Sequence, residues 1–339
     1  MDHTRRKTII DVGRHAGVST KTVSRVFNDA PHVSDSIRQR VLAAAAALNY
    51  HPNVMAQALV RRRSHMIGLV YENPSPSYVT ELQMGVLHRL RDERYRLVVI
   101  PVESIADRAG EVVSLLRSAA LDGVVLAPPA SDNPRILDDL AAAGIRFARI
   151  TPNRLLDAGP SNIVDDVTAA REIAAHVIGL GHRDIAIIKG DPTHASSDAR
   201  LLGYSQAFYA AGVIMRPEWI EQGLFTRESG QIAAARLLAG SRRPTAILAQ
   251  NDEMAVGALM VARERGLSVP QDLSIAGFDD SDVARIAWPP LTTVRQPVFE
   301  MAQAAADMVI AQLEGTSFQM RRDHAHELIL GGSTAPPAG

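Results

Sequence analysis

Apolar residues recur at helical spacing through residues 8–28 (TIIDVGRHAGVSTKTVSRVFN) and predict two short helices there. The apolar face of the first helix ends at Ala16, and that of the second begins at Val23. Gly17 lies between them and permits a backbone turn that other residues resist. The pattern therefore indicates two helices joined by a tight turn, with the polar side chains of the second helix facing outward.

Capping residues support these helices and predict a third. Thr8 can cap the first helix, and the Asp11 side chain three residues later can bond back to Thr8 in a variant of the capping box. Ser19 can cap the second helix, and Ser34 can cap a third whose apolar face spans residues 37–48. The first fifty residues thus predict a small all-α head.

The remainder of the chain alternates apolar runs of strand length with amphipathic runs of helical length. The strand-like runs are residues 67–70, 97–100, 123–126, 185–188, 246–249 and 273–276. The helix-like runs include residues 78–93, 168–180, 197–211, 253–265 and 298–314. Continuous apolar strands between helices indicate parallel sheets that are covered on both faces. The length of the pattern favours two α/β lobes over a single sheet.

Charge divides the chain at the same place. Residues 1–63 carry 11 Lys or Arg against four Asp, a net charge of +7, whereas residues 64–339 carry 25 basic and 33 acidic residues, a net charge of −8. Clustered positive charge draws the head toward phosphates, while the acidic body should not bind DNA. A basic helix-turn-helix is typical of a head whose second helix enters the major groove. A small three-helix bundle with a solvated polar face is the alternative.

Residues 48–63 (LNYHPNVMAQALVRRR) join the head to the body. Pro52 breaks the preceding helix, and Asn53 can cap a new short one. Such a hinge helix could lie in the minor groove, where a small residue such as Ala56 allows close approach and Leu59 can wedge between base steps. An ordinary linker is the alternative.

Composition excludes several classes of protein. No apolar run approaches the roughly 20 residues needed to span a bilayer, and the N-terminus lacks the apolar segment of a secretory signal. The chain has no Cys, which excludes disulfides and thiolate metal sites and fits a reducing cytoplasm. A length of 339 residues favours two or three domains.

Sequence motifs of catalysis are also missing. The chain has neither a G-x-S-x-G nucleophile motif nor a G-x-x-x-x-G-K-[ST] phosphate loop. His324 and His326 lie among acidic residues, but their strand-like surroundings favour a solvated edge over a metal site. We therefore expect no enzyme activity, no cofactor and no metal.

The head and hinge resemble those of the LacI/GalR (lactose-repressor/galactose-repressor) family of bacterial transcription regulators. The matching residues of the head are Asp11-Val12, Ala16-Gly17-Val18-Ser19, Thr22-Val23-Ser24-Arg25-Val26, Asn28, Val33-Ser34, Leu48-Asn49-Tyr50, Pro52-Asn53, Ala56 and Leu59. Later motifs extend the resemblance along the body, at Gly181-His182, Asn251-Asp252, Gly277-Phe278-Asp279-Asp280 and Pro290-Leu291-Thr292-Thr293-Val294.

The resemblance implies a domain organisation. Residues 1–49 would form the helix-turn-helix domain, residues 50–63 the hinge, and residues 64–339 an effector-binding and dimerisation domain. That last domain would consist of two Rossmann-like lobes of the periplasmic-binding-protein type. Both lobes would be discontinuous: lobe 1 about 64–165 and 294–324, lobe 2 about 166–293 and 325–333.

The predicted DNA contacts lie on the head and the hinge. Thr20, Lys21 and Arg25 are the expected base readers, since Arg suits O6 and N7 of guanine and a short Thr suits a thymine methyl or a phosphate. The full predicted set is Thr8, Ser19, Thr20, Lys21, Thr22, Ser24, Arg25, Asn28, Asn53, Ala56 and Leu59.

The predicted effector site follows from the rule that ligands of open α/β sheets bind beyond the carboxyl ends of the strands. By resemblance, Arg200, Asn251 and Asp279 contact the effector in sugar-responsive members of the family. The further candidates are Tyr78, Thr151, His194, Phe278, Trp288 and Gln296.

These residues also have structural interpretations. Asn251 could simply cap the following helix, and Asp279 could cap a turn. Trp288 could belong to the core, and His194 could be a solvated loop residue. Thr151 stands about where the lactose repressor has a sugar-binding carboxylate, which argues against lactose-like specificity.

The resemblance implies a ligand-gated repressor that acts as a homodimer on a pseudo-palindromic operator. Its partners would be double-stranded operator DNA, a small-molecule effector of carbohydrate type and a second copy of the chain, with no membrane partner. We expect it in the cytoplasm, associated with the nucleoid.

Overall fold

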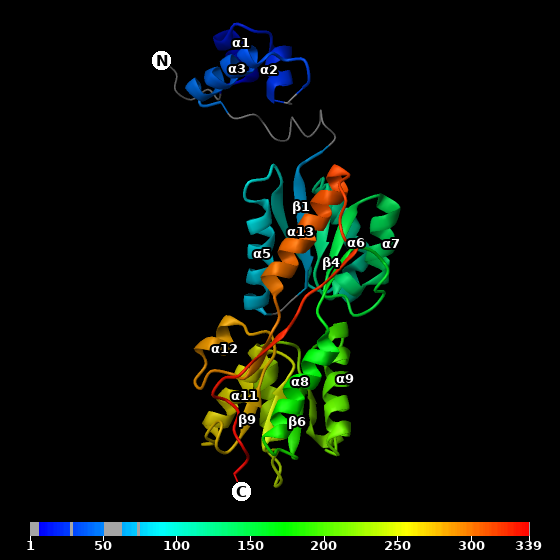
Figure 1. Ribbon diagram of the computed structural model, residues 1–339, viewed down its shortest axis with the longest axis vertical. Coiled ribbons are helices and arrows are strands. Elements are labelled where there is room, and N and C mark those ends of the chain that lie inside the picture. The colour runs from blue at the N-terminus through cyan, green and yellow to red at the C-terminus, as the bar shows by residue number, and fades with distance from the viewer. Residues whose placement is uncertain (1–6, 28–29, 51–62, 73–74, 339) are drawn as a thin grey trace. The chain divides into compact units, whose positions relative to one another are not determined.

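The computed structural model describes residues 7–27, 30–50, 63–72 and 75–338, which fall into two compact units, residues 1–65 and 66–339 (Figure 1). Residues 51–62 of the predicted hinge and the predicted DNA contacts at Asn28, Asn53, Ala56 and Leu59 lie outside the described residues.

The first unit contains the three predicted helices, α1 (Ile9–Ala16), α2 (Thr20–Phe27) and α3 (Asp35–Ala47). The capping box of α1 is confirmed: the Thr8 amide donates to Asp11 Oδ2 at 2.9 Å, and the Asp11 amide donates to Thr8 Oγ1 at 3.4 Å. Gly17 ends α1 with φ of 64°, the left-handed conformation that favours glycine.

Two predicted caps differ in outcome. The Thr22 amide donates to Ser19 Oγ at 3.1 Å, so Ser19 caps α2 as expected. Ser34 occupies the N-cap position of α3, but its side chain makes no capping bond because its hydroxyl is hydrogen-bonded to Ser36 Oγ at 3.2 Å. The core of the head is small and aliphatic: Val12, Val23, Val26, Val41, Ala44 and Ala45.

The second unit contains two α/β lobes. In lobe 1, six strands form one parallel sheet in the order β11-β5-β4-β3-β1-β2. The strands are β1 (Met66–Tyr71), β2 (Arg96–Pro101), β3 (Gly123–Leu126), β4 (Arg146–Ile150), β5 (Ser161–Ile163) and β11 (Arg321–Asp323). One core of this lobe includes α5 (Pro76–Leu90) and α13 (Val298–Glu314), and the other includes α6 (Ile105–Ser118) and α7 (Pro134–Ala143). The short 3-10 helix η1 (Ala130–Asp132) follows β3.

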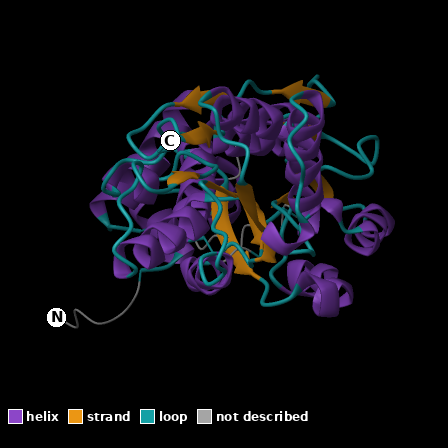
Figure 2. Ribbon diagram, turned by 90° about the horizontal axis from the view of Figure 1, so that it is seen from below, coloured by secondary structure: helices purple, strands orange, loops and turns teal. Residues whose placement is uncertain are grey.

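In lobe 2, four parallel strands are ordered β7-β6-β8-β9. They are β6 (Ile185–Lys189), β7 (Ile220–Gln222), β8 (Ala246–Ala249) and β9 (Ser274–Ala276). The helices are α8 (Asp166–Gly179), α9 (Ala195–Ala210), α10 (Arg227–Leu237), α11 (Asp252–Glu264) and α12 (Asp282–Ile286), with the 3-10 helix η2 (Pro217–Trp219). Helices flank the strands (Figure 2), with α8 and α9 in one core and α10 and α11 in the other.

The chain passes between the lobes more than once. It leaves lobe 2 after β10 (Thr293–Arg295), forms α13 in lobe 1, and returns to pair β12 (Glu327–Ile329) antiparallel with β10. The carboxyl ends of strands from both lobes can therefore line one cavity. Among the described residues, no helix is long and apolar enough to cross a membrane.

Candidate DNA-contacting surface and ligand cavity

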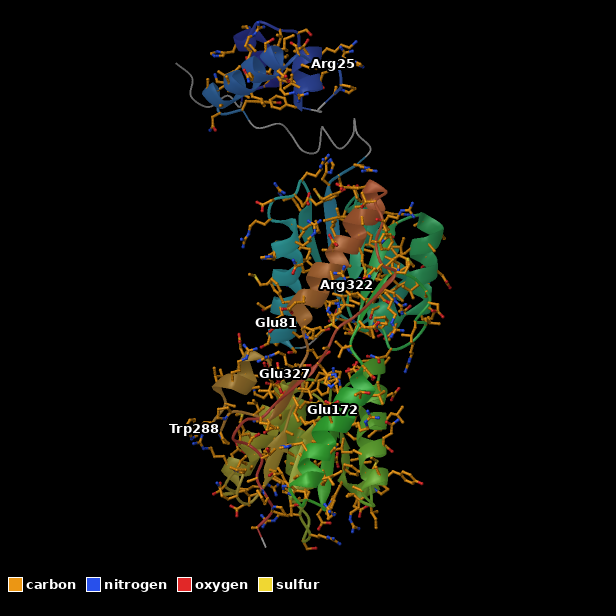
Figure 3. The ribbon with its side chains drawn as sticks, viewed as in Figure 1. Arg25, Glu81, Glu172, Trp288, Arg322 and Glu327 are labelled. Carbon is orange, nitrogen blue, oxygen red and sulfur yellow. The ribbon has the colours of Figure 1, made fainter. Side chains whose placement is uncertain are left out.

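The outer face of α2 is the candidate DNA-contacting surface. Val23 and Val26 are buried in the head, which leaves Thr20, Lys21 and Arg25 exposed on the opposite face. In Figure 3 the Arg25 side chain projects outward from the head. Ser24 is half-buried.

Two basic side chains of the head bond to backbone carbonyl groups of the head itself. Arg40 Nη2 donates to the carbonyl of Ala16 at 3.0 Å, and Arg38 Nη1 donates to that of Val26 at 3.4 Å. These carbonyls lie in the last turns of α1 and α2, where a cation complements the helix dipole. Part of the positive charge counted in the sequence thus holds the head together.

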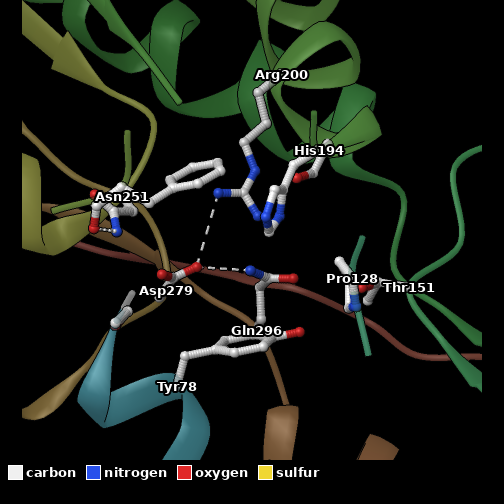
Figure 4. Close-up of a pocket in the computed structure, with 11 residues that line it drawn as sticks. Tyr78, Pro128, Thr151, His194, Arg200, Asn251, Asp279 and Gln296 are labelled. Atoms are coloured by element: carbon white, nitrogen blue, oxygen red, sulfur yellow. Dashed lines mark hydrogen bonds and ion pairs between the residues drawn. The ribbon is translucent and has the colours of Figure 1, made fainter. Parts of the chain in front are cut away.

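The candidate ligand cavity lies within the second unit and is lined from both lobes. The space between its lining atoms, including the part open to solvent, is about 390 Å³. Seven of the nine predicted effector residues line it, as Figure 4 illustrates. The lining residues are Ser75, Tyr78, Pro128, Thr151, His194, Ser196, Arg200, Phe225, Asn251, Asp279 and Gln296.

Arg200 is the only cationic side chain of this lining, if His194 is neutral. Its Nε donates to Asp166 Oδ1 at 2.8 Å, and its Nη1 donates to the carbonyl of Gln250 at 2.5 Å. The guanidinium lies over the Phe278 ring, 3.8 Å from its centroid. Burial would lower the pKa of Arg200, but the charges of Asp166 and Asp279 outweigh it and raise that pKa. Among the described residues Nη2 has no hydrogen-bond partner, so this edge can meet a ligand.

Asp279 follows β9 and faces Arg200. Its Oδ1 lies 3.8 Å from Arg200 Nη1 and accepts a hydrogen bond of 2.7 Å from Gln296 Nε2 (Figure 4). Burial raises the pKa of Asp279 to about 7, against the opposing effect of Arg200. The residue has φ of 116°, a strained conformation for a residue other than glycine. Asp279 does not cap the next helix, because Ser281 is the N-cap of α12.

Asn251 and His194 have defined structural environments. Asn251 Oδ1 accepts from the Met254 amide at 3.0 Å, which confirms that Asn251 caps α11, and its Nδ2 donates to the carbonyl of Phe225 at 2.9 Å. His194 is buried rather than solvated, and burial lowers its pKa to about 4, so it is neutral at physiological pH. Both side chains still line the cavity.

Two predicted effector residues do not line the cavity. Phe278 is fully buried beneath Arg200 and supports that side chain from below. Trp288 is 79% exposed and belongs neither to this cavity nor to the core. It follows α12 and projects away from lobe 2 in Figure 3, because the chain turns outward there. Trp288 is therefore not a candidate ligand contact.

Sequence reasoning missed Phe225 and Asp166. Phe225 follows β7, whose three residues include only one apolar side chain, so the strand does not show in the hydrophobic pattern. Asp166 is the first residue of α8 and resembles an ordinary helix-initiating acid until its bond to Arg200 is seen. Within the described part of the chain, no cluster of His, Asp or Glu is arranged to hold a metal ion.

Comparisons with known proteins find similar proteins for both units of the chain. A model of bacterial regulatory proteins of the lacI family matches residues 8–53, and a model of periplasmic binding protein-like domains matches residues 174–334. The chain is 37% identical to the HTH-type transcriptional regulator DegA of Bacillus subtilis, covering 87% of this chain and 88% of DegA. It is 32% identical to the ribose operon repressor of Haemophilus influenzae, covering 93% of this chain and 94% of the repressor.

Solved structures are similar over nearly the whole chain. The Lac repressor dimer bound to operator and the anti-inducer ONPF has a TM-score of 0.84 and 27% identity, covering 98% of this chain and all of that one. The complex of the transcriptional regulator CelR with cellobiose has a TM-score of 0.73 and 29% identity, covering 97% of this chain and all of that one.

Proposed function

This chain belongs to the lacI family of bacterial regulatory proteins, and we propose that a small uncharged carbohydrate bound in the cavity around Arg200 sets its affinity for operator DNA. The observation that carries the proposal is the buried Arg200 in a cavity lined from both lobes: its Nη1 lies 3.8 Å from Asp279 Oδ1, and its Nη2 has no hydrogen-bond partner among the residues that the structure describes. A ligand there can favour one arrangement of the lobes over another.

The charges in the cavity argue for an uncharged ligand. One guanidinium already faces two carboxylates, Asp166 and Asp279, and His194 is neutral. The cavity thus has no surplus positive charge to offer a sugar acid or a sugar phosphate, whose burial would be costly without a partner. Carboxylate, guanidinium and amide groups can bind the paired hydroxyls of a sugar.

The apolar part of the cavity lining suits the face of a single sugar ring. Tyr78, Pro128 and Phe225 add apolar surface that suits the C–H face of a sugar ring. The CelR relative was solved with cellobiose, which is also an uncharged sugar.

For the DNA side, we propose that Thr20, Lys21 and Arg25 read base edges in the major groove and that Leu59 wedges into the centre of the operator. Repression is the proposed outcome, as in the named relatives, the ribose operon repressor and PurR of Erwinia tasmaniensis (33% identical, covering 90% of each chain). We further propose that it acts in the cytoplasm, on the nucleoid.

We also propose that the protein acts as a homodimer through one side of the second unit. Apolar side chains are exposed there on α5 (Met84 and Leu87), on α11 (Met260) and at Ile286 and Trp288. In Figure 1 α5 and α12 lie on the same side of the two lobes. Large exposed apolar patches mark interaction surfaces, and a second copy fits because the similar Lac repressor was solved as a dimer.

A thermal-shift screen at pH 7.5 tests the proposed ligand class. The panel pairs neutral hexoses and pentoses with their sugar acids, sugar phosphates and amino sugars. We expect at least one neutral monosaccharide to raise the melting temperature, and its acid and phosphate to leave it unchanged, since ligand that binds the folded state stabilises it. Stabilisation by the anionic sugars alone would contradict the proposal.

A further inference from the structure

The loop after β4 is held by lobe 1 and contacts lobe 2. It comprises residues 151–155 and is called the 151–155 strap below. Thr151, its first residue, lines the ligand cavity with φ of 41°, and Leu155, its last, has φ of 50°. Two left-handed residues in so short a loop persist only where the surroundings fix the backbone.

Arg149 fixes the carbonyl groups of the strap. This residue of β4 is fully buried. Its Nη1 donates to the carbonyl of Leu155 at 2.6 Å, and its Nη2 donates to that of Arg154 at 2.7 Å. Its Nε donates to the carbonyl of Ser131 in η1 at 2.6 Å. The planar guanidinium thus ties the strap to the turn that follows β3.

Asp132 fixes the amide groups of the same strap. Its Oδ1 accepts from the amides of Asn153 and Arg154 at 3.0 and 2.9 Å, and lies 3.5 Å from Arg149 Nη2. Burial raises the pKa of Asp132, although these amides and Arg149 act in the opposite direction. Both the donors and the acceptors of the strap backbone are therefore held by side chains of lobe 1.

The side chains of Asn153 and Arg154 bond to residues of α8 and α9 in lobe 2. Figure 1 shows where these two helices lie in that lobe. Asn153 Nδ2 donates to Asp166 Oδ2 at 3.0 Å. The other oxygen of Asp166 accepts from Arg200 Nε. One buried carboxylate thus connects the ligand-facing Arg200 to the strap. A second contact joins Arg154 Nη2 to Asp198 Oδ2 at 3.0 Å.

We propose that Asn153 is a positioning residue that holds the two lobes in the arrangement of this structure, termed closed, by bonding the same carboxylate that orients Arg200. A ligand on Arg200 restrains Asp166 and so favours its bond to Asn153, which links occupancy of the cavity to lobe position. Asn153 does not line the cavity, so it acts through Asp166. The inference rests on the proposed function in one respect, namely that the position of the lobes controls DNA binding.

The two inter-lobe contacts provide a matched pair of variants. Asp166 is almost fully buried, so its hydrogen bond to Asn153 is shielded from water. The side chains of Arg154 and Asp198 are 55% and 63% exposed, and exposed ion pairs contribute little. Loss of the Asn153 bond should therefore open the lobes more than loss of the Arg154 bond.

The chain contains no Cys, so introduced cysteines can be labelled specifically. Asp138→Cys on α7 of lobe 1 and Gln206→Cys on α9 of lobe 2 place spin labels at exposed positions. The distance between the two spin labels is measured by double electron–electron resonance on the full chain without ligand or DNA. Labelled chains are diluted into unlabelled ones. The variants are Asn153→Ala, Asn153→Asp and Arg154→Ala.

We expect Asn153→Ala to raise the ratio of open to closed lobes about tenfold, the usual effect of losing a hydrogen bond to a charged group. Asn153→Asp should raise it further, because a second carboxylate would face Asp166. Arg154→Ala should change it about twofold or less. If Asn153→Ala changes the ratio of open to closed lobes no more than Arg154→Ala does, the proposal is overturned. Because neither ligand nor DNA is present, the outcome is independent of the proposed effector.

Discussion

Arg200 and Asp166 form an ion pair in the protein interior, with 2.8 Å between Nε and Oδ1 and both side chains almost fully buried. The guanidinium also lies 3.8 Å from Asp279. Arg200 thus compensates two carboxylates that are largely removed from water, in addition to facing the cavity.

Replacement of Arg200 should therefore affect stability as well as ligand binding. We expect Arg200→Ala to lower the free energy of unfolding by about 3–5 kcal/mol, because it leaves buried charge uncompensated. Urea unfolding measures the loss. Arg236→Ala, which removes an exposed pair with Glu221, is the control and should change stability by less than about 0.5 kcal/mol. Equal stability of the two variants would show that Arg200 is not needed to balance the buried carboxylates.

Asp279 makes stability dependent on pH. Its pKa is about 7 in the folded protein against an ordinary value of 3.8, so its contribution to stability is complete below about pH 4 and is lost as pH rises through 7. Asp279→Asn cannot ionise. The melting temperature of the variant relative to the wild type should therefore rise between pH 5.5 and pH 8. Asp198→Asn, at an exposed carboxylate, is the control. A difference that stays constant or falls with pH would contradict burial as the dominant influence on Asp279.

Arg25 should carry sequence information. We expect Arg25→Ala to cost about 1–3 kcal/mol on the selected operator and to relax preference at one base pair. Fluorescence anisotropy on operator and random DNA separates this effect from general loss of charge. Arg14→Ala, on α1, removes an equal charge and should weaken both DNAs alike. Equal weakening of both DNAs by Arg25→Ala would assign Arg25 to a phosphate.

Trp288 should act at the proposed dimer interface rather than in the ligand cavity. Large aromatic side chains are often hot spots of protein interfaces, so we expect Trp288→Glu to weaken dimerisation by at least about 2 kcal/mol. Sedimentation velocity over a concentration series measures the effect. Tyr209→Glu changes another exposed aromatic residue, on α9, and serves as the control. If both variants dimerise like the wild type, the apolar side near Trp288 is not the interface.

Apolar runs of strand length and helical spacing of apolar residues made much of the fold predictable from the sequence. The strand-like runs at 67–70 and 246–249 fall within β1 and β8, and the helix expected over 298–314 is α13. Strands β5 and β7 have three residues each, of which only one is apolar, so no apolar run reveals them. Their positions depend on tertiary pairing with neighbouring strands.

The ligand cavity was predictable where residues follow strands that show as apolar runs in the sequence. Asn251 and Asp279 follow β8 and β9, and both line the cavity. Asp166 and Asn153 could not be recognised, because their significance lies in hydrogen bonds to residues distant in sequence and not in local spacing. Trp288 was misplaced for a related reason: its position near the strand ends in sequence does not fix the direction in which the chain turns.

The proposed link between ligand and DNA is best tested by operator affinity measured with and without sugar. A bound sequence is first selected from random DNA with the full chain, and its Kd is then measured by anisotropy in the presence of each neutral monosaccharide. We expect a pseudo-palindromic sequence whose Kd changes at least about tenfold with one of these sugars, which corresponds to a coupling free energy of roughly 1.4 kcal/mol. A selected operator whose Kd no neutral sugar alters, while a sugar acid or phosphate does, would contradict the proposal.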